Sequence, residues 1–166
     1  YERPIPERHR LIFYLGHLEA FDWNLLSEPL GLGRFNEAYD QLFAFGIDPV
    51  DGGLPSEPAS AWPAETDVRA YGAQGRATLS RRLAEADSSF AGIDGAKRLH
   101  VAIEHRLMHA ETLAYLLHRL SDRHKIVPSL TDPEPPAPSA MAHVVRIPAG
   151  RATLGLTRDA GFGWDN

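Results

Sequence analysis

Residues 99–120, which read LHVAIEHRLMHAETLAYLLHRL, decide the fold of this 166-residue chain. Apolar side chains recur there at steps of three and four residues, the spacing of one face of an α-helix. The pattern extends over about 96–123 and predicts the longest helix of the protein. The predicted apolar face contains Leu99, Ala102, Ile103, Leu113, Leu116, Leu117 and Leu120, and His105 and His109 fall within it.

Three further helices are expected before this one. Phe13, His17 and Phe21 repeat at four-residue steps and predict a helix over about 8–26, with His17 on its buried face. A shorter apolar face predicts a helix over 35–45, and Thr66 is the expected N-cap of a third that ends near residue 86. Because the residues between 48 and 63 are rich in proline and glycine, we expect no regular structure there.

Four helices with mostly short connections predict a mainly α fold, an antiparallel four-helix bundle over residues 1–126. The proline-rich residues 127–143 are expected to form an extended linker. Residues 144–150 and 153–155 have the pattern of two short strands. We therefore expect residues 144–166 to begin a second domain that the sequence does not complete.

Composition excludes several classes of function. The net charge is −5 without a run of lysine or arginine, so nucleic acid is not an expected partner. No apolar stretch has the roughly 20 residues of a membrane span, and the first ten residues do not resemble a signal peptide, so we expect a soluble, cytoplasmic protein. The sequence contains no cysteine, so any metal must be bound by nitrogen or oxygen ligands. The sequence does not predict the oligomeric state.

The histidines point to chemistry. His105 and His109 lie one helical turn apart and can reach one ion, although an isolated pair at this spacing also arises by chance. The alternative is a core histidine satisfied by a hydrogen bond. Three buried imidazoles favour a shared cation, which predicts a metal site formed by His17, His105 and His109. Three ligands leave positions open for catalysis, and zinc, iron and nickel all remain compatible with this ligand set.

Three other residues are candidates for supporting roles. Glu104 and Glu111 flank the histidine pair and could accept a hydrogen bond from a ligand imidazole, but solvation is the commoner role of such acids. Arg69 is a candidate for binding a substrate carboxylate, with a plain surface arginine as the alternative.

Two segments resemble one known family. Residues 14–17 (YLGH) together with residues 104–113 (EHRLMHAETL) resemble the DinB-like domain of the EgtB-like sulfoxide synthases of ergothioneine biosynthesis. Residues 145–150 (VRIPAG), Leu154-Gly155 and residues 161–166 (GFGWDN) resemble the start of the formylglycine-generating-enzyme-like domain, an α+β fold of the C-type-lectin kind, that follows in this family. The two resemblances cover nearly the whole chain in the family's order.

The resemblance implies a non-haem iron enzyme. In the family three histidines bind Fe(2+), and the enzyme uses O2 to join a thiol to the imidazole of hercynine as a sulfoxide. By position the ligands here are His17, His105 and His109. The family's catalytic tyrosine, its acid/base group, belongs to the second domain, beyond Asn166.

The chain also departs from the family at two points. Of two arginines three residues apart that bind γ-glutamyl-cysteine in some members, the chain has Arg69 but carries Gly72 at the second position. Cysteine, another small thiol or a selenium compound, as in a selenoneine-type synthase, is therefore an alternative donor. Met108 replaces a glutamine that precedes the last ligand in some members.

Two other kinds of protein remain as alternatives. One is a DinB-like thiol transferase that uses zinc or another divalent ion. The other is an interaction module without catalysis, whose helices are only rich in histidine.

Overall fold

The chain divides into two units, Tyr1–Ser121 and Asp122–Asn166. This computed structural model describes residues 1–44, 57–86, 90, 93–126, 144–156 and 163. The predicted linker, 127–143, and most of the loop between 48 and 63 lie outside the described residues.

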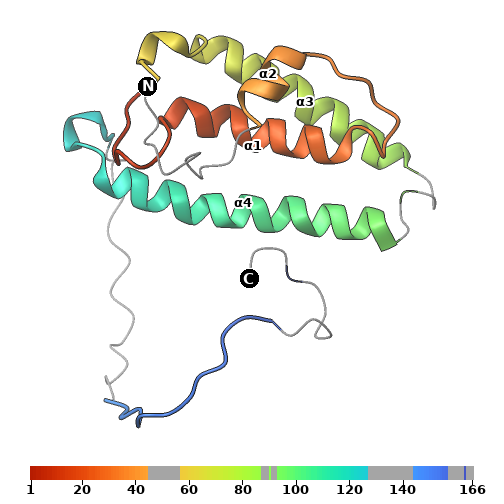
Figure 1. The fold of residues 1–166 in the computed structure, drawn as a ribbon. Coiled ribbons are helices and arrows are strands. Elements are labelled where there is room, and N and C mark those ends of the chain that lie inside the picture. The colour runs from red at the N-terminus through yellow and green to blue at the C-terminus, as the bar shows by residue number, and fades with distance from the viewer. Residues whose placement is uncertain (45–56, 87–89, 91–92, 127–143, 157–162, 164–166) are drawn as a thin grey trace, which may run out of the picture. The chain divides into compact units, whose positions relative to one another are not determined.

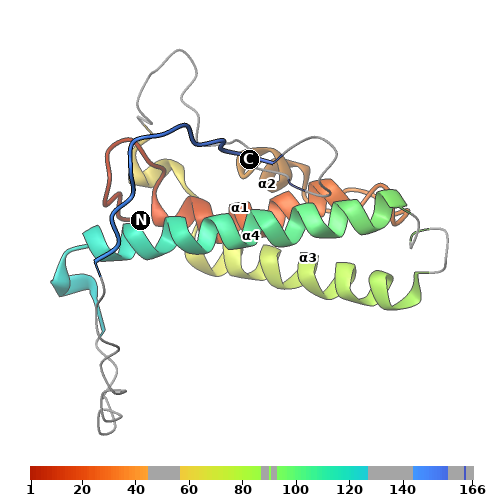
Figure 2. The same ribbon diagram turned by 90° about the horizontal axis from the view of Figure 1, so that it is seen from below.

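The first unit is built around one helix. Helix α1, Leu11–Leu26, packs against α3, Glu65–Glu85, against α4, Ile93–Arg119, and against the short α2, Glu37–Leu42. Figure 1 shows α1 between α3 and α4, and the view from below in Figure 2 again places α4 along α1. The prediction of a mainly helical protein is confirmed for the described residues.

The directions of α1, α3 and α4 are those of an alternating antiparallel bundle, in which the first and third helices run the same way. The difference from the prediction is that α2 is short and α1 packs directly against α3. Helices α1 and α4 are antiparallel, because His17 meets His105 while Arg98 reaches the carbonyl of Leu25. Helices α1 and α3 run in the same direction, because Arg82 at the end of α3 donates to the carbonyl of Leu30, which follows α1. The long connection between α1 and α3 brings the chain back to the starting end, as crossover connections do in other bundles.

Burial explains why α1 is the central helix. Phe13, Tyr14, Ala20 and Trp23 have exposed fractions of 2% or less. Because three other helices contact α1, its apolar residues are spread around the helix rather than gathered on one stripe. The main core cluster contains Ile12, Phe13, Tyr14, Ala20, Phe43, Val68, Tyr71 and Leu116.

The helix ends correct several predicted boundaries. Helix α1 begins at Leu11 rather than near residue 8, because Arg8 is held in a turn by its bond to the carbonyl of Ile5. Helix α2 is shorter than 35–45 and starts after Asn36, whose side chain accepts the backbone N–H of Tyr39 at 3.1 Å. Residue 45 lies outside the described part.

The later boundaries shift by a few residues. Thr66 is not the N-cap of α3, because the helix already begins at Glu65 after Ala64, directly behind Pro63. Helix α4 starts at Ile93 and ends at Arg119, and the residues predicted to continue it form a separate 3-10 turn, η3, Asp122–His124. In the proline-rich loop, where no regular structure was expected, Ala59–Ala61 forms a 3-10 turn, η2.

Two residues predicted in the buried face of α4 are exposed. Ile103 and Leu117 have exposed fractions of 55% and 50%, and Leu107 between them reaches 58%. Ile103 and Leu107 lie on the side of α4 opposite His105, and Leu117 lies on its flank. In the described part of the chain, α4 packs against α1. The apolar side chains of α4 therefore cover a wider arc of the helix than the face that α1 buries.

The second unit shows no sheet among its described residues. Residues 144–156, where two strands were predicted, form no regular element. Val144, Ile147 and Leu154 are at least 87% exposed. A strand needs a partner to satisfy its backbone hydrogen bonds, and none is present in the described residues of this unit. The predicted second domain is not shown.

The described helices differ from membrane-spanning helices in length or in polarity. None of them is both long enough and apolar enough to cross a bilayer.

We predict that Gly16→Ala destabilises the protein by about 1–3 kcal/mol through overpacking. A Cβ at position 16 would lie 2.6 Å from ring atoms of Phe43, closer than carbon atoms can approach. The expected cost of overpacking is larger than the stability of roughly 1 kcal/mol that alanine gains over glycine within a helix. Urea unfolding measures the difference. Gly33→Ala is the control, because nothing lies within 4 Å of the added carbon, and a Gly16→Ala protein as stable as the wild type would contradict the packing.

Candidate metal centre

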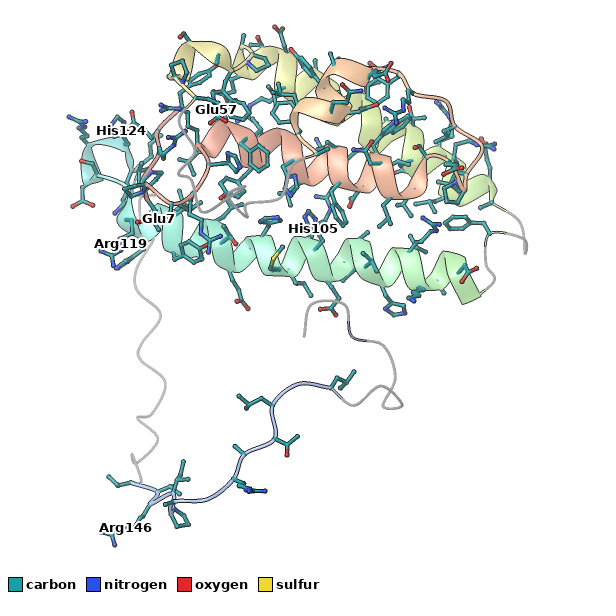
Figure 3. The ribbon with its side chains drawn as sticks, in the orientation of Figure 1. Glu7, Glu57, His105, Arg119, His124 and Arg146 are labelled. Atoms are coloured by element: carbon teal, nitrogen blue, oxygen red, sulfur yellow. The ribbon has the colours of Figure 1, made fainter. Side chains whose placement is uncertain are left out.

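Three histidines converge between α1 and α4. His17 comes from α1, and His105 and His109 come from successive turns of α4. Their exposed fractions are 4%, 2% and 1%. One ligand atom from each ring lies within 4.8 Å of the other two. Figure 3 shows His105 on the side of α4 that faces α1. The structure thus brings together the three residues that the sequence singled out.

A backbone carbonyl fixes the tautomer of His17. Its Nδ1 lies 2.6 Å from the carbonyl oxygen of Phe43. A carbonyl oxygen only accepts, so Nδ1 carries the proton and donates it. In a neutral ring this leaves a lone pair on Nε2, directed toward His105. A bond of this kind, from the far nitrogen of a ligand histidine to a carbonyl, is a usual support of metal sites.

The spacing between His17 and His105 suits a shared ion. Their Nε2 atoms are 3.1 Å apart. Two nitrogen ligands at about 2.1 Å from one metal, at tetrahedral or octahedral angles, are separated by about 3.0–3.4 Å. Without metal, Nε2 of His17 is an acceptor, so Nε2 of His105 must donate its proton across this gap. Metal binding therefore requires that proton to leave Nε2 of His105.

Aromatic rings of α1 contact each imidazole. Phe13 stacks on His17 with ring centres 4.7 Å apart, and Phe21 stacks on His105 at 3.5 Å. Tyr14 meets His109 edge to face at 5.6 Å. These contacts restrict rotation of the imidazoles, so the ring directions are set by packing before any ion binds.

His109 supplies the clearest test of whether these residues fit a metal. Its Nδ1 is buried and has no hydrogen-bond partner among the described residues. Leaving a buried polar atom unsatisfied costs about 1–3 kcal/mol. The residues present are three neutral nitrogen donors in an apolar setting, the ligand type that suits zinc, iron, copper and nickel. The site therefore fits a transition metal.

Burial keeps the three rings neutral. Burial, with a smaller contribution from neighbouring histidines, lowers the pKa of His105 to about 3 and that of His109 to about 4. The pKa of His17 is lowered too, mainly by burial, although the carbonyl of Phe43 opposes the shift. Metals bind the unprotonated ring, so at neutral pH all three are ready to ligate without first losing a charge.

The neighbouring Tyr14 is held in its protonated form. Burial raises the pKa of Tyr14 to about 12, and the charge of Arg8 partly opposes that rise. At neutral pH this side chain is therefore an uncharged wall of the site. It adds no anionic ligand to the three histidines.

The other predicted residues lie away from the three rings. Glu104 and Glu111 are exposed on α4, whereas the acceptor that supports His17 is the carbonyl of Phe43. Arg69 is exposed, and its guanidinium binds Glu65 one turn earlier at 2.7 Å. At Gly72 a Cβ would lie 3.0 Å from Cγ of Glu19, so a larger residue there requires the side chain of Glu19 to shift.

Sequence reasoning missed the charged residues beside the histidines. Glu19 and Asp22 on α1 pair with Arg106 on α4, next to His105. The available signal was Glu19 itself, an acid in a segment whose neighbours Leu18, Ala20 and Trp23 are apolar. An acid buried in such a segment requires a positive partner. The carbonyl of Phe43 gave no signal, because every residue carries a carbonyl.

Comparison with known proteins gives one relative. The sequence is 30% identical over 185 aligned positions to ergothioneine biosynthesis protein 1 of Neurospora crassa. The alignment covers 99% of this chain and 21% of the relative, so the chain spans about a fifth of that protein's length. No family model matches the sequence, and no solved structure matches it. The similarity supports a relation to the EgtB-like proteins.

We predict that the metal-free protein loses stability as the pH falls below 6.5. The unfolded state binds protons on these histidines near pH 6.5, whereas folded His109 and His105 bind them near pH 4 and pH 3. The buried histidines therefore make their full contribution to the free energy of unfolding above pH 6.5. As the pH decreases below 6.5, this free energy falls by about 1.4 kcal/mol per pH unit for each buried histidine.

Urea unfolding at several pH values, with a chelator present, measures this dependence. His109→Gln should reduce its slope, whereas glutamine at the exposed His118 should leave the slope unchanged. A stability that stays constant between about pH 6.5 and pH 4.5 would show that the rings are not buried as neutral groups.

Proposed function

We propose that His17, His105 and His109 bind ferrous iron, and that the protein is an O2-dependent sulfoxide synthase of ergothioneine biosynthesis. The observation that carries the proposal is the convergence of three buried imidazoles within 4.8 Å. The similarity to ergothioneine biosynthesis protein 1 supports the choice of pathway. The proposed substrates are hercynine, a thiol and O2.

The proposed reaction is balanced with O2 as the sole oxidant. The thiol loses its S–H hydrogen, the imidazole of hercynine loses one C–H hydrogen, and a C–S bond forms between them. The sulfur takes one oxygen atom to become a sulfoxide, and the second oxygen atom leaves as water with the two hydrogens. When bound, iron supplies the electron transfer that lets O2 react and the positions where the substrates are oriented.

The role of this part of the chain is to hold and orient. Three histidines on two helices occupy one side of an ion and leave other positions open, the arrangement of a catalytic rather than a structural site. The carbonyl of Phe43 keeps the Nε2 lone pair of His17 free for the metal. Phe21 packs against the ring of His105 and excludes water from that side.

Arg69 remains a proposed ligand for the carboxylate of the sulfur donor. It is exposed, and its guanidinium is paired with the carboxylate of Glu65, whose place a substrate carboxylate would have to take. With Gly72 in place of a second arginine, cysteine, a different small thiol or a selenium compound is a candidate donor beside γ-glutamyl-cysteine.

We also propose that residues 144–166 begin a formylglycine-generating-enzyme-like domain. Their exposed apolar side chains, Val144, Val145, Ile147 and Leu154, are consistent with a segment that packs into a larger domain. The acid/base group of the reaction is proposed to lie in that domain, beyond Asn166.

We predict that replacing any one of the three histidines by glutamine abolishes tight binding of Fe2+. Two nitrogen ligands remain in each variant, and the third position is filled by a poorer donor. Anaerobic reconstitution followed by elemental analysis measures the bound metal. His100→Gln, an exposed change on the same helix, is the control and should retain metal. Equal metal content in all variants would mean that the histidines do not form the site.

The metal present after purification without added metal decides between two functions. Iron is expected if the protein is a sulfoxide synthase. Zinc together with no O2 consumption would support the thiol transferase of the same helical fold.

We predict that the full-length iron protein consumes one O2 for each sulfoxide formed from hercynine and a thiol. The assay compares cysteine, γ-glutamyl-cysteine and a selenium donor, and mass spectrometry identifies the product. The His17→Gln protein should form none. If the iron-loaded wild type takes up no O2 with any donor, the proposed activity is wrong.

A further inference from the structure

A cluster of charged side chains crosses the helix interfaces beside the histidines. The cluster consists of Glu19 and Asp22 on α1, Arg76 on α3 and Arg106 on α4. Oε2 of Glu19 accepts from Arg106 at 3.1 Å, while its Oε1 pairs with Arg76. Asp22 accepts from Nε of Arg106 at 2.8 Å.

We propose that Arg106 is a positioning residue that sets the rotation of α4 so that His105 and His109 face His17. The inference rests on the proposed metal site and names a residue that supports it. Arg106 contacts neither the ligand nitrogens nor a substrate in this role. It acts through the placement of the helix that carries two of the three ligands.

The position of Arg106 in the sequence lets it control the orientation of α4. It directly follows His105, and its partners Glu19 and Asp22 lie two and five residues after His17. One guanidinium thus joins the two helices almost level with the imidazoles. Neighbouring residues of a helix differ in direction by about 100°, so a rotation of α4 that moved Arg106 would turn His105 by the same angle.

The geometry of the guanidinium makes the contact directional. Nε and one terminal nitrogen of Arg106 both meet Asp22, and that terminal nitrogen also donates to the Leu18 carbonyl at 3.4 Å. A planar group held on two nitrogens resists rotation, whereas a lysine would make a single contact that swivels. Besides the contact between His105 and His17, a further described hydrogen bond between these helices, from Arg98 to the carbonyl of Leu25, involves an exposed side chain.

Burial supports a geometric role over a purely stabilising one. The side chains of Glu19 and Asp22 are 8% and 14% exposed. Burial raises the pKa of Asp22, and the charge of Arg106 opposes that rise. The carboxylates are buried while the Arg106 side chain is 38% exposed, so desolvation of the acids offsets much of the attraction and the pair recovers little net stability. The ion pair between Arg106 and the two acids instead fixes one register of α4 along α1.

Glu19 provides a matched control, because its two oxygens serve different helices. Arg76→Gln removes the contact to α3, which carries no ligand, and Arg106→Gln removes the contact to α4. Both variants leave one partner on the same buried carboxylate and should lower the urea midpoint. They should differ in their effect on the metal.

Anaerobic titration with Co2+ reports affinity, and the Co2+ absorption spectrum reports ligand number and geometry. We expect Arg106→Gln to weaken Co2+ binding by about 10–100-fold and to alter the spectrum, as the loss of supporting contacts does in metal proteins. Arg76→Gln should keep the wild-type affinity and spectrum. Arg106→Lys should recover only part of the affinity, and it replaces Arg106→Gln if that variant does not fold.

A metal-free measurement separates this inference from the proposed function. Long-range 1H–15N NMR of the wild type should show the proton of His17 on Nδ1 and that of His105 on Nε2, as the 2.6 Å and 3.1 Å contacts require. Arg106→Gln, or Arg106→Lys in its place, should lose this defined pattern, and Arg76→Gln should retain it.

Each outcome has a separate meaning. A wild type that binds no Co2+ overturns the metal site, while the NMR comparison still decides the role of Arg106. The positioning role is wrong if the Arg106 variant keeps the wild-type histidine pattern. It is also wrong if the Arg76 and Arg106 variants lose metal affinity equally.

Discussion

Three imidazoles share the interface between α1 and α4, where the helices would otherwise pack hydrocarbon against hydrocarbon. Each ring brings two polar nitrogens into a space that water hardly reaches. Burial prevents the rings from becoming charged, so the protein must satisfy them with hydrogen bonds or with a cation. The Phe43 carbonyl satisfies one nitrogen and a contact between His17 and His105 satisfies two more. The rest of the unit is arranged around this requirement.

Helix α1 meets the requirement by contacting every other described helix of its unit. Gly16 lets the Phe43 ring lie directly on the helix, which brings the Phe43 carbonyl to His17. Gly72 of α3 makes room for the side chain of Glu19, and Glu19 in turn reaches Arg106. Gly16 and Gly72 thus permit the two contacts that flank the candidate metal site. These two glycines affect the candidate site indirectly, because they leave space for Phe43 and Glu19 to reach it.

Local spacing was enough to predict the helices and the candidate ligands, because His17 lies on an apolar stripe and His105 and His109 are one turn apart. The ion pair of Glu19 and Arg106 joins residues 87 positions apart, and no local period reports such a pair. The direct packing of α1 on α3 was missed because α2, which was expected to be a full member of the bundle, has only six residues. Ile103 was misplaced because an apolar period does not reveal which faces a helix buries.

The ligands are divided unequally, with two on consecutive turns of α4 and the third 88 residues earlier in the chain. A two-histidine chelate on one helix needs only local structure, so it can persist when α1 and α4 separate. The unfolded chain would then bind the ion weakly through His105 and His109. Tight binding would require α1 to pack against α4 and add His17. A bound metal would stabilise this fold by the difference between three-point and two-point binding, which is less than its full affinity. Because α1 also contacts α2 and α3 and supplies half of the main core cluster, release of an ion through loss of His17 would require the core of the unit to open.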